Sequence, residues 1–320
     1  MWAAVFPGQG SQHIGMGRFL FDNFKSTQRF FEEASDSVKI NFKKLCFDGD
    51  ESSLSLTENT QPALVLVSHC YSEAIKETTD LRFSYLAGHS VGEYSAALAG
   101  GTIIFADAIF AVHERGKAMQ EAVPEGVGAM LAVLGPDDEQ VKKLCTWAES
   151  ESGFSPLEAA NFNCPGQVVI SGSKKAADWL RENFKPELFD PPLKRIKFIE
   201  LKVSAPFHCS LMKPAEEKMT LILNGLKFQK SKIPIVQNID AKESQEAELI
   251  RSKLIKQISG TVLWTQCITR MRELGVNHIL ELGAGQVLSG LIKKIDSTHF
   301  KTFNMHTIEE LKTLESKAKL

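Results

Sequence analysis

The tightest local constraint on this chain is the segment Gly88-His89-Ser90-Val91-Gly92. It follows the apolar run "FSYLA" and precedes the helix-forming run "EYSAALA", which ends at Gly100 and Gly101. Glycines on both sides of Ser90 permit a sharp turn at positions where a side chain would clash with the backbone. The sequence therefore predicts a buried strand that turns directly into a helix, with Ser90 at the bend.

The segment fits the GxSxG pattern, in which a serine hydroxyl projects from a strand-to-helix turn. At the start of a helix, the dipole and the free N–H groups favour negative charge, and the Val91 N–H is the natural first donor to an oxyanion. Ser90 is therefore a candidate nucleophile. The alternative is that Ser90 merely caps the helix in a tight turn.

A nucleophilic serine needs a base, and the neighbouring His89 is a poor candidate because adjacent side chains on such a turn point in different directions. His208, in "SAPFHC", follows Pro206 in a loop-like segment, and loops on a rigid scaffold often carry catalytic groups. His208 is a candidate base. Spacing alone does not select it over the other histidines of the chain.

A second glycine-rich turn, "FPGQGSQHIGMG", follows the first apolar run. It is not a dinucleotide-binding GxGxxG, because His13 occupies the third glycine position, and it lacks the Lys-Ser/Thr of a phosphate-binding loop. Such a turn can instead present a backbone N–H, such as that of Gln9, to an oxyanion. Gln9 is therefore the candidate second donor.

Short apolar runs alternate with amphipathic segments along the chain, which predicts an α/β fold. Between residues 126 and 200 the order becomes βαββαβ, the signature of a ferredoxin-like split unit. We expect this segment to be a small domain inserted into a larger α/β domain formed by residues 1–125 and 201–320. After the insertion the pattern predicts strands at 233–240 and 276–283, and a short surface helix at the C-terminal end.

Composition excludes several classes of function. The 320 residues carry a formal net charge of −2, which argues against a global attraction to nucleic acid or to an anionic membrane surface. The N-terminal residues lack the basic start of a signal peptide, and no apolar stretch approaches the roughly 20 residues of a membrane span. The six cysteines form no CxxC pair, so we expect no metal site and free thiols in a reducing cytoplasm.

A series of motifs in order along nearly the whole chain resembles the malonyl-CoA:acyl carrier protein transacylase family and related acyltransferase domains of polyketide synthases. The motifs are "FPGQGSQ", "TQPAL", "GHSVGEYSA", "RGKAMQ", "NFNCPGQVVISG", "PFH", "KQISGTVLWT" and "ELGAGQVLSGLIKKI". The resemblance implies a hydrolase-like core with a parallel sheet and a small ferredoxin-like domain. It implies transfer of malonyl from coenzyme A through a serine ester to the phosphopantetheine thiol of an acyl carrier protein, by a monomer without a cofactor.

Residue by residue, the resemblance makes Ser90 the nucleophile and His208 its base. The backbone N–H groups of Gln9 and Val91 would form the oxyanion hole. Gln257, in "KQISG", would orient His208 through its backbone carbonyl, in place of a triad acid. A Ser–His pair with a modest orienting group suffices for a thioester, because a thiolate leaves without much acid assistance.

The resemblance also assigns substrate contacts. Arg115, in "ERGKAMQ", would bind the free malonyl carboxylate, since the planar guanidinium holds a carboxylate bidentately; the alternative is a solvated charge on a helix surface. Phe207 would crowd the α-methyl group of a methylmalonyl substrate. The alternative is that Phe207 is an ordinary packing residue. Asn163 would lie near the acyl-binding cleft. The sequence departs from the common family pattern at "GAGQVL", where "GPG" is frequent, and at "APFHC" around the candidate base. These departures leave the subfamily open.

An acidic carrier protein favours a local basic patch, and Lys194, Arg195, Lys293 and Lys294 are the candidates. The alternative is that they are ordinary solvated surface charges. Rival functions are a non-catalytic acyl-binding scaffold, a polyketide acyltransferase acting in trans with a different acyl selectivity, and a Ser–His thioesterase. The thioesterase would need an acid between serine and histidine, and Asp190 and Glu200 are the nearby choices.

Overall fold

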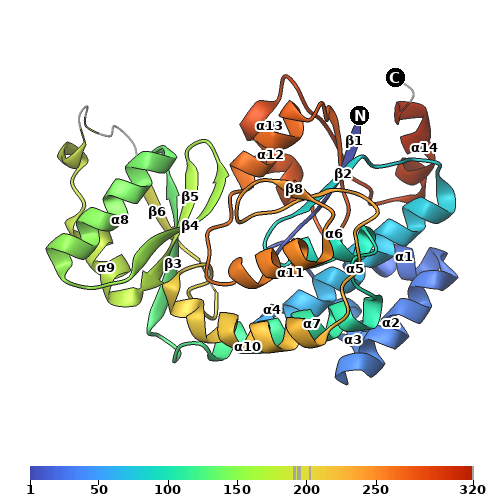
Figure 1. Ribbon diagram of the computed structural model, residues 1–320, viewed down its shortest axis with the longest axis horizontal. Coiled ribbons are helices and arrows are strands. Elements are labelled where there is room, and N and C mark those ends of the chain that lie inside the picture. Colours follow the sequence, from blue (N-terminus) through green and yellow to red (C-terminus); the bar gives the residue numbers. More distant parts are fainter. Residues whose placement is uncertain (190–191, 193–195, 202, 319–320) are drawn as a thin grey trace.

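The computed structural model describes residues 1–189, 192, 196–201 and 203–318. Three of the residues singled out above, Asp190, Lys194 and Arg195, therefore lie outside the described residues. The fold is α/β, as predicted, and it is built around two separate sheets (Figure 1). Among the described helices, none combines the length and the apolar character needed to cross a membrane.

The larger sheet has six strands in the order β10-β9-β1-β2-β7-β8. Neighbouring strands are parallel except β7 and β8, which pair antiparallel, so the predicted parallel sheet is mixed at one edge. The strands are β1 (Trp2–Phe6), β2 (Tyr85–Gly88), β7 (Ile235–Val236), β8 (Glu243–Ser244), β9 (His278–Glu281) and β10 (Lys301–Phe303).

The predicted strand at 233–240 is much shorter in the structure, where only Ile235 and Val236 pair as β7. The chain turns back immediately afterwards, because the Ala241 N–H bonds the Gln237 carbonyl at 2.9 Å. Ala241 itself has a positive φ of 53°. This reversal produces the antiparallel β8 and leaves the polar residues after β7 free for other contacts.

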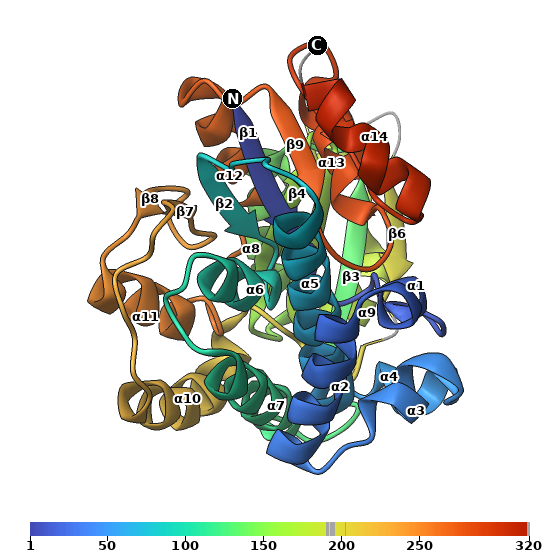
Figure 2. The same ribbon diagram turned by 90° about the vertical axis from the view of Figure 1, so that its right-hand side faces the viewer.

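Helices cover both faces of the larger sheet, which explains the uninterrupted apolar run of its central strand β1. Ala3 and Val5 pack with the cluster beneath α12 and α13, whereas Ala4 and Phe6 face the cluster around α5. Figure 2 shows α5 running past the sheet with α2 and α7 beside it. The helices of this part are α1 (Arg18–Asn23), α2 (Lys25–Val38), α3 (Phe42–Phe47), α4 (Glu51–Ser55), α5 (Thr57–Thr78), α6 (Gly92–Ala99), α7 (Phe105–Glu121), α10 (Lys213–Gly225), α11 (Ala247–Lys256), α12 (Trp264–Glu273), α13 (Val287–Asp296) and α14 (Ile308–Ala318).

The C-terminal helix α14 lies at the surface, as expected, and it also buries two apolar side chains. Its Leu311 and Leu314 side chains are buried in the large core cluster, close to α5. The helix therefore has one solvated face and one face that closes the core, as an amphipathic helix of a globular protein does.

The smaller sheet is antiparallel, with strand order β4-β5-β3-β6. Its strands are β3 (Gly128–Leu134), β4 (Leu157–Cys164), β5 (Gln167–Ser173) and β6 (Lys197–Glu200), and its helices are α8 (Asp138–Ser152) and α9 (Lys174–Asn183). Figure 1 shows both helices on the outer side of this sheet.

Because side chains alternate along a strand, each strand of the smaller sheet serves two surroundings. Leu131 and Ile170 pack with α8 and α9 in a separate apolar cluster. Met130 and Val169 point the other way and line a cavity toward the larger part. A backbone bridge ties the two parts together, because Phe162 N–H donates to the Val262 carbonyl at 2.9 Å.

Candidate active site

Ser90 lies at the bend between β2 and α6, as the sequence predicts, with a positive φ of 52°. Both glycines of the motif are needed for close backbone contacts. A Cβ atom on Gly88 would lie 1.9 Å from the Gly92 carbonyl carbon, and one on Gly92 would lie 2.2 Å from the Phe6 carbonyl oxygen. The turn is therefore packed against β1 and against itself, which holds the serine in its strained conformation.

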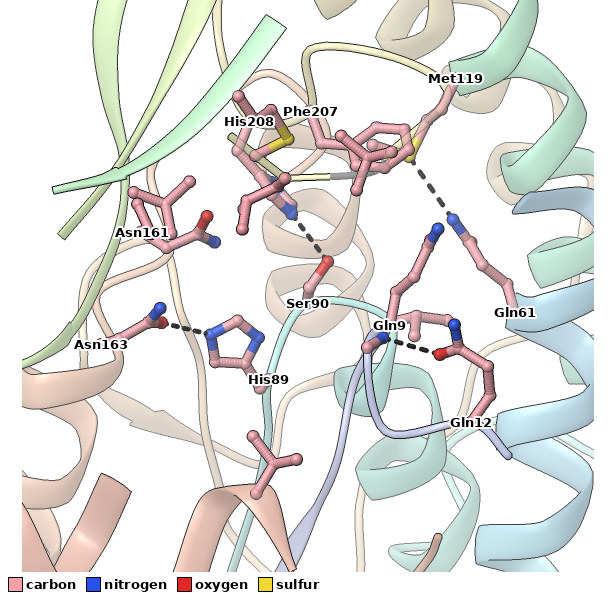
Figure 3. A pocket seen from close by; sticks show the side chains of 18 of the residues that line it. Gln9, Gln12, Gln61, His89, Ser90, Met119, Asn161, Asn163, Phe207 and His208 are labelled. Atoms are coloured by element: carbon pink, nitrogen blue, oxygen red, sulfur yellow. Dashed lines mark hydrogen bonds between the residues drawn. The ribbon is translucent and has the colours of Figure 1, made fainter. Parts of the chain in front are cut away.

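The Ser90 hydroxyl oxygen lies 2.7 Å from Nε2 of His208 (Figure 3). His208 Nδ1 lies 2.8 Å from the backbone carbonyl of Gln257, which can only accept a hydrogen bond. The Nδ1 atom therefore carries the proton, and Nε2 is left as the acceptor for the Ser90 hydroxyl. His208 thus lies between the Gln257 carbonyl and the Ser90 hydroxyl, where it can take the serine proton.

His208 lies in the segment after β6, only 4% exposed. Burial, followed by the nearby Arg115 guanidinium, lowers the pKa of His208 to about 3, against the raising effect of its bond to the Gln257 carbonyl. The imidazole is therefore neutral at physiological pH, the form that a general base needs.

His89 points away from the serine oxygen, as expected for its place on the turn (Figure 3). Its Nε2 lies 2.9 Å from the side-chain oxygen of Asn163, and its ring meets Trp264 edge to face. Burial lowers the pKa of His89, while the bond to Asn163 opposes this shift. Asn163 thus contacts the turn residue beside the nucleophile and lines the same cavity.

The two candidate oxyanion donors, Gln9 and Val91, line one cavity with Ser90. Val91 immediately precedes α6, and Gln9 lies in the loop after β1. Within the described part of the chain, neither backbone N–H makes a hydrogen bond to a carbonyl. A Cβ atom on Gly8 would lie 2.4 Å from the His89 carbonyl oxygen, so a glycine there lets the two loops approach each other.

Arg115 extends from α7 into the cavity and is 1% exposed, so the alternative of a solvated surface arginine is wrong. Its Nη2 donates to the Ser90 hydroxyl oxygen at 3.2 Å and to Gln257 Oε1 at 2.9 Å. Its Nη1 donates to Gln61 Oε1 at 2.8 Å. Burial lowers the pKa of Arg115. The guanidinium is therefore a buried cation held by neutral amides and directed at the nucleophile.

The cavity has a volume of about 420 Å³ and is lined by both polar and apolar side chains. Phe207, next to the candidate base, contributes to its apolar wall with Met130 and Val169 of the smaller sheet. Phe207 therefore belongs to the cavity wall as well as to the apolar core.

Half of the predicted basic patch lies near this cavity. Lys293 and Lys294 are exposed in the last turn of α13. Lys294 Nζ donates to Gln167 Oε1 at 3.3 Å, and Gln167 is one of the residues that line the cavity. Lys294 therefore lies beside the cavity wall, and Lys293 precedes it in the same helix turn, whereas the other two members of the patch fall outside the described residues.

Glu200, one of the two acids considered for a hydrolytic triad, lies elsewhere. Its carboxylate pairs with Arg181 at 3.0 Å on the smaller sheet, where its side chain is 48% exposed. The Nδ1 atom of His208, which would contact a triad acid, is bonded to the Gln257 carbonyl instead. Glu200 is therefore not the third member of a triad.

Two residues that support the turn, Asn238 and Glu93, are not indicated by the sequence analysis. Asn238 Oδ1 accepts the Ser90 N–H at 2.8 Å, and its Nδ2 donates to the Gly88 carbonyl at 2.8 Å. Glu93, in the first turn of α6, accepts from the Asn238 N–H and from Gln257 Nε2. Burial raises the pKa of Glu93, and these two hydrogen bonds, which donate to the carboxylate, oppose that shift.

The signals for these residues were present but indirect. Glu93 and Gln61 lie inside the motifs "GHSVGEYSA" and "TQPAL", where they read as ordinary helix residues. Asn238 lies in the run 233–240 that was expected to be a strand. Only the turn after β7 brings its side chain under Ser90.

Comparison with known proteins identifies related acyltransferases. The family model described as "Acyl transferase domain" matches residues 3–305. The malonyl CoA-acyl carrier protein transacylase of Bacillus subtilis is 41% identical, over 92% of this chain and 90% of the relative. The protein of the same name from Staphylococcus aureus is 38% identical, over 97% of each chain.

Solved structures extend the likeness to three dimensions. A malonyl-transacylase solved in complex with its type II polyketide synthase acyl-carrier protein is 39% identical, with a TM-score of 0.91 over 99% of each chain. Sequence and structure agree over nearly the full length of these relatives. The chain belongs to the malonyl CoA-acyl carrier protein transacylase family.

Proposed function

We propose that this chain transfers a malonyl group from coenzyme A, through an ester on Ser90, to the phosphopantetheine thiol of an acyl carrier protein. The observation that carries the proposal is the position of the Ser90 hydroxyl oxygen, 2.7 Å from His208 Nε2 and 3.2 Å from Arg115 Nη2 in one cavity. A base and a cation meet at one nucleophile. The name of the family identifies malonyl-CoA as the acyl donor and an acyl carrier protein as the acceptor.

In the first half-reaction, Ser90 attacks the thioester carbonyl while His208 removes its hydroxyl proton. The negative charge that develops on the carbonyl oxygen is stabilised by the N–H groups of Gln9 and Val91. When the intermediate collapses, the C–S bond breaks and the coenzyme A sulfur receives the proton from His208. The product is a malonyl ester of Ser90.

In the second half-reaction, the carrier thiol loses its proton to His208 and attacks the ester carbonyl. The bond between Ser90 and the acyl carbon breaks, and the serine oxygen receives the proton back. The carrier leaves with a new thioester, and the enzyme returns to its starting state. Because coenzyme A departs before the carrier reacts, the kinetics are ping-pong.

Arg115 supplies selectivity in this scheme. Its fork binds the free malonyl carboxylate, an interaction that an acetyl group cannot make. Gln61 and Gln257 each accept one N–H of the guanidinium and so fix its plane. Phe207 limits the room for an α-methyl group, which disfavours methylmalonyl. Asn163 supports the cavity through its bond to His89.

The domain organisation is part of the proposal. Residues 126–200 correspond to a small ferredoxin-like domain, and residues 1–125 and 201–320 correspond to a hydrolase-like catalytic domain. In support, the smaller sheet runs from Gly128 to Glu200 with the order βαββαβ along the chain. The cavity between the two parts is where the acyl group would bind.

Lys293 and Lys294 are proposed to contact the acidic carrier protein, because both are exposed and Lys294 bonds a residue of the cavity wall. That the enzyme works as a monomer, without a metal or cofactor and in the cytoplasm, stays a prediction. Membership of the family does not favour the thioesterase, the scaffold or a polyketide acyltransferase of different acyl selectivity.

One experiment tests the proposal. The purified protein is incubated with radiolabelled malonyl-CoA, and the wild type is compared with Ser90→Ala. We expect stable label on the wild type alone, which moves to added acyl carrier protein. Rapid release of free malonate would instead indicate a hydrolase, and an unlabelled wild type would indicate a scaffold.

A further inference from the structure

Glu93 is a buried carboxyl group that no step of the proposed reaction uses. It lies in the first turn of α6 beneath the Ser90 turn and is 1% exposed. Both of its oxygens accept hydrogen bonds: Oε1 from the backbone N–H of Asn238, and Oε2 from the side-chain Nε2 of Gln257 at 2.7 Å. The carboxyl group therefore links Asn238, which accepts the Ser90 N–H, with Gln257, which contacts both His208 and Arg115.

The link through Gln257 matters most for the substrate. A side-chain amide has one donor end and one acceptor end, and hydrogen-bond partners decide which way it faces. The donor end of Gln257 faces Glu93 and the Ser90 carbonyl, at 2.7 and 3.0 Å. The acceptor end therefore faces Arg115, whose Nη2 donates to Gln257 Oε1 at 2.9 Å.

We propose that Glu93 is a positioning residue. It fixes the orientation of the Gln257 side-chain amide, so that the Arg115 guanidinium faces the malonyl carboxylate. The inference rests on the proposed function, because it concerns how Arg115 selects its acyl group. Glu93 touches neither the substrate nor the serine hydroxyl and acts only through its two partners.

The chemistry of a glutamine at this position shows why a carboxyl group is required. Its amide would have one acceptor and one donor, whereas Asn238 N–H and Gln257 Nε2 both donate. Whichever way it turned, its NH₂ group would face another N–H donor. To avoid that contact, Gln257 would have to turn and present its own NH₂ to the Arg115 guanidinium, which would displace the fork.

The test compares Glu93→Gln with Glu93→Asp, using the rates of self-acylation by malonyl-CoA and by acetyl-CoA. Glu93→Gln should lower kcat/KM for malonyl-CoA at least about tenfold more than for acetyl-CoA. Glu93→Asp keeps two acceptor oxygens and should retain more of the malonyl preference. A residue needed only for packing gives the opposite order, because glutamine has nearly the shape of glutamate.

Glu281 offers a matched control. It is another buried glutamate, and its carboxyl oxygens accept the backbone N–H groups of Leu288 and Ser289 at the start of α13, at 3.0 and 2.8 Å. Among the described residues it has no hydrogen bond to Gln257 or Arg115. Glu281→Gln should change thermal stability but leave the malonyl-to-acetyl ratio unchanged.

If Glu93→Gln does not yield folded protein, Gln257→Met tests the same link from its other end. This variant keeps the backbone carbonyl that orients His208 but removes the acceptor of Arg115 Nη2, so it should also lose malonyl preference. Equal losses for both acyl groups, or an unchanged ratio in these variants, would overturn the inference. A wild type that is not acylated by malonyl-CoA would instead refute the proposed function.

Discussion

The imidazole of His208 lies 2.7 Å from the Ser90 hydroxyl oxygen, although the two residues are 118 positions apart in the chain. Both residues have a positive backbone φ, 52° for Ser90 and 60° for His208. Residues other than glycine rarely adopt this backbone conformation. Such strain persists only where the surrounding structure holds it, and it concentrates at functional sites. Here the turn after β2 and the segment after β6 are both held in this way, and the reacting atoms meet between them.

Loss of the base should nearly abolish acylation. We expect His208→Ala to lower kcat/KM for self-acylation by about 10³-fold or more, because Ser90 would have no group to accept its proton. Rapid-quench measurement of the labelled ester gives the rate. A variant that acylates within tenfold of the wild type would show that another group removes the proton.

The buried histidine should make the protein sensitive to acid. The pKa of His208 is lowered from 6.5 to about 3 in the folded state, so the unfolded chain binds a proton that the folded chain does not. Stability from this residue is fully present above pH 6.5 and is lost as pH falls toward 3. Urea unfolding at pH 7.5 and pH 5 should show a larger loss for the wild type than for His208→Gln.

The lowered pKa of His208 also determines how the acylation rate depends on pH. Because His208 stays neutral in the folded protein, the acylation rate should not fall through an imidazole titration between pH 7 and pH 5. A titration near pH 6.5 in the acylation profile of folded enzyme would show that the imidazole is solvated during the reaction.

Arg115 should control acyl selectivity. Arg115→Met removes a charge-assisted contact to the malonyl carboxylate, and we expect kcat/KM for malonyl-CoA to fall about 100-fold. The rate with acetyl-CoA, which has no carboxylate to bind, should stay the same or rise. The two rates are measured by intact-protein mass spectrometry, and a parallel fall in both would argue against a carboxylate contact.

The two glycines around Ser90 should be irreplaceable. Gly88→Ala places a methyl group 1.9 Å from a backbone carbon, so we expect a loss of about 3 kcal/mol or more in the free energy of unfolding. Gly290→Ala is the control. It lies within α13 with nothing near its Cβ position, and should raise stability by about 1 kcal/mol.

The lysines of α13 should affect only the second half-reaction. Reversing Lys293 and Lys294 to Glu should raise the KM for the acyl carrier protein about tenfold at low salt, through repulsion of an acidic partner. Self-acylation by malonyl-CoA should continue at the wild-type rate. The matched control reverses Lys43 and Lys44, exposed on α3, which lies far from α13 in both views (Figures 1 and 2). Unchanged transfer in the α13 variant would remove these lysines from the docking surface.

Some features followed from the sequence because their causes are local. The bend at Ser90 depends on glycines two positions away, where the backbone leaves no room for a Cβ atom. The strands and helices of the smaller sheet follow the period of their apolar residues, and β3 alternates between helix-covered and cavity-facing side chains. The predicted orientation of His89 away from the serine oxygen is a local effect of the same kind.

Other features depend on contacts between distant segments, and no local pattern contains them. Spacing alone leaves His208 as one histidine among several. Without the family resemblance, the sequence favours a surface position for Arg115, whereas the fold buries it. The short β7 and the turn after it bring Asn238 to Ser90, and only then do the buried oxygens of Glu93 find their two donors. Local steric limits decided the shape of the catalytic turn, whereas the burial of charge and the pairing of hydrogen bonds across the core decided which side chains meet there.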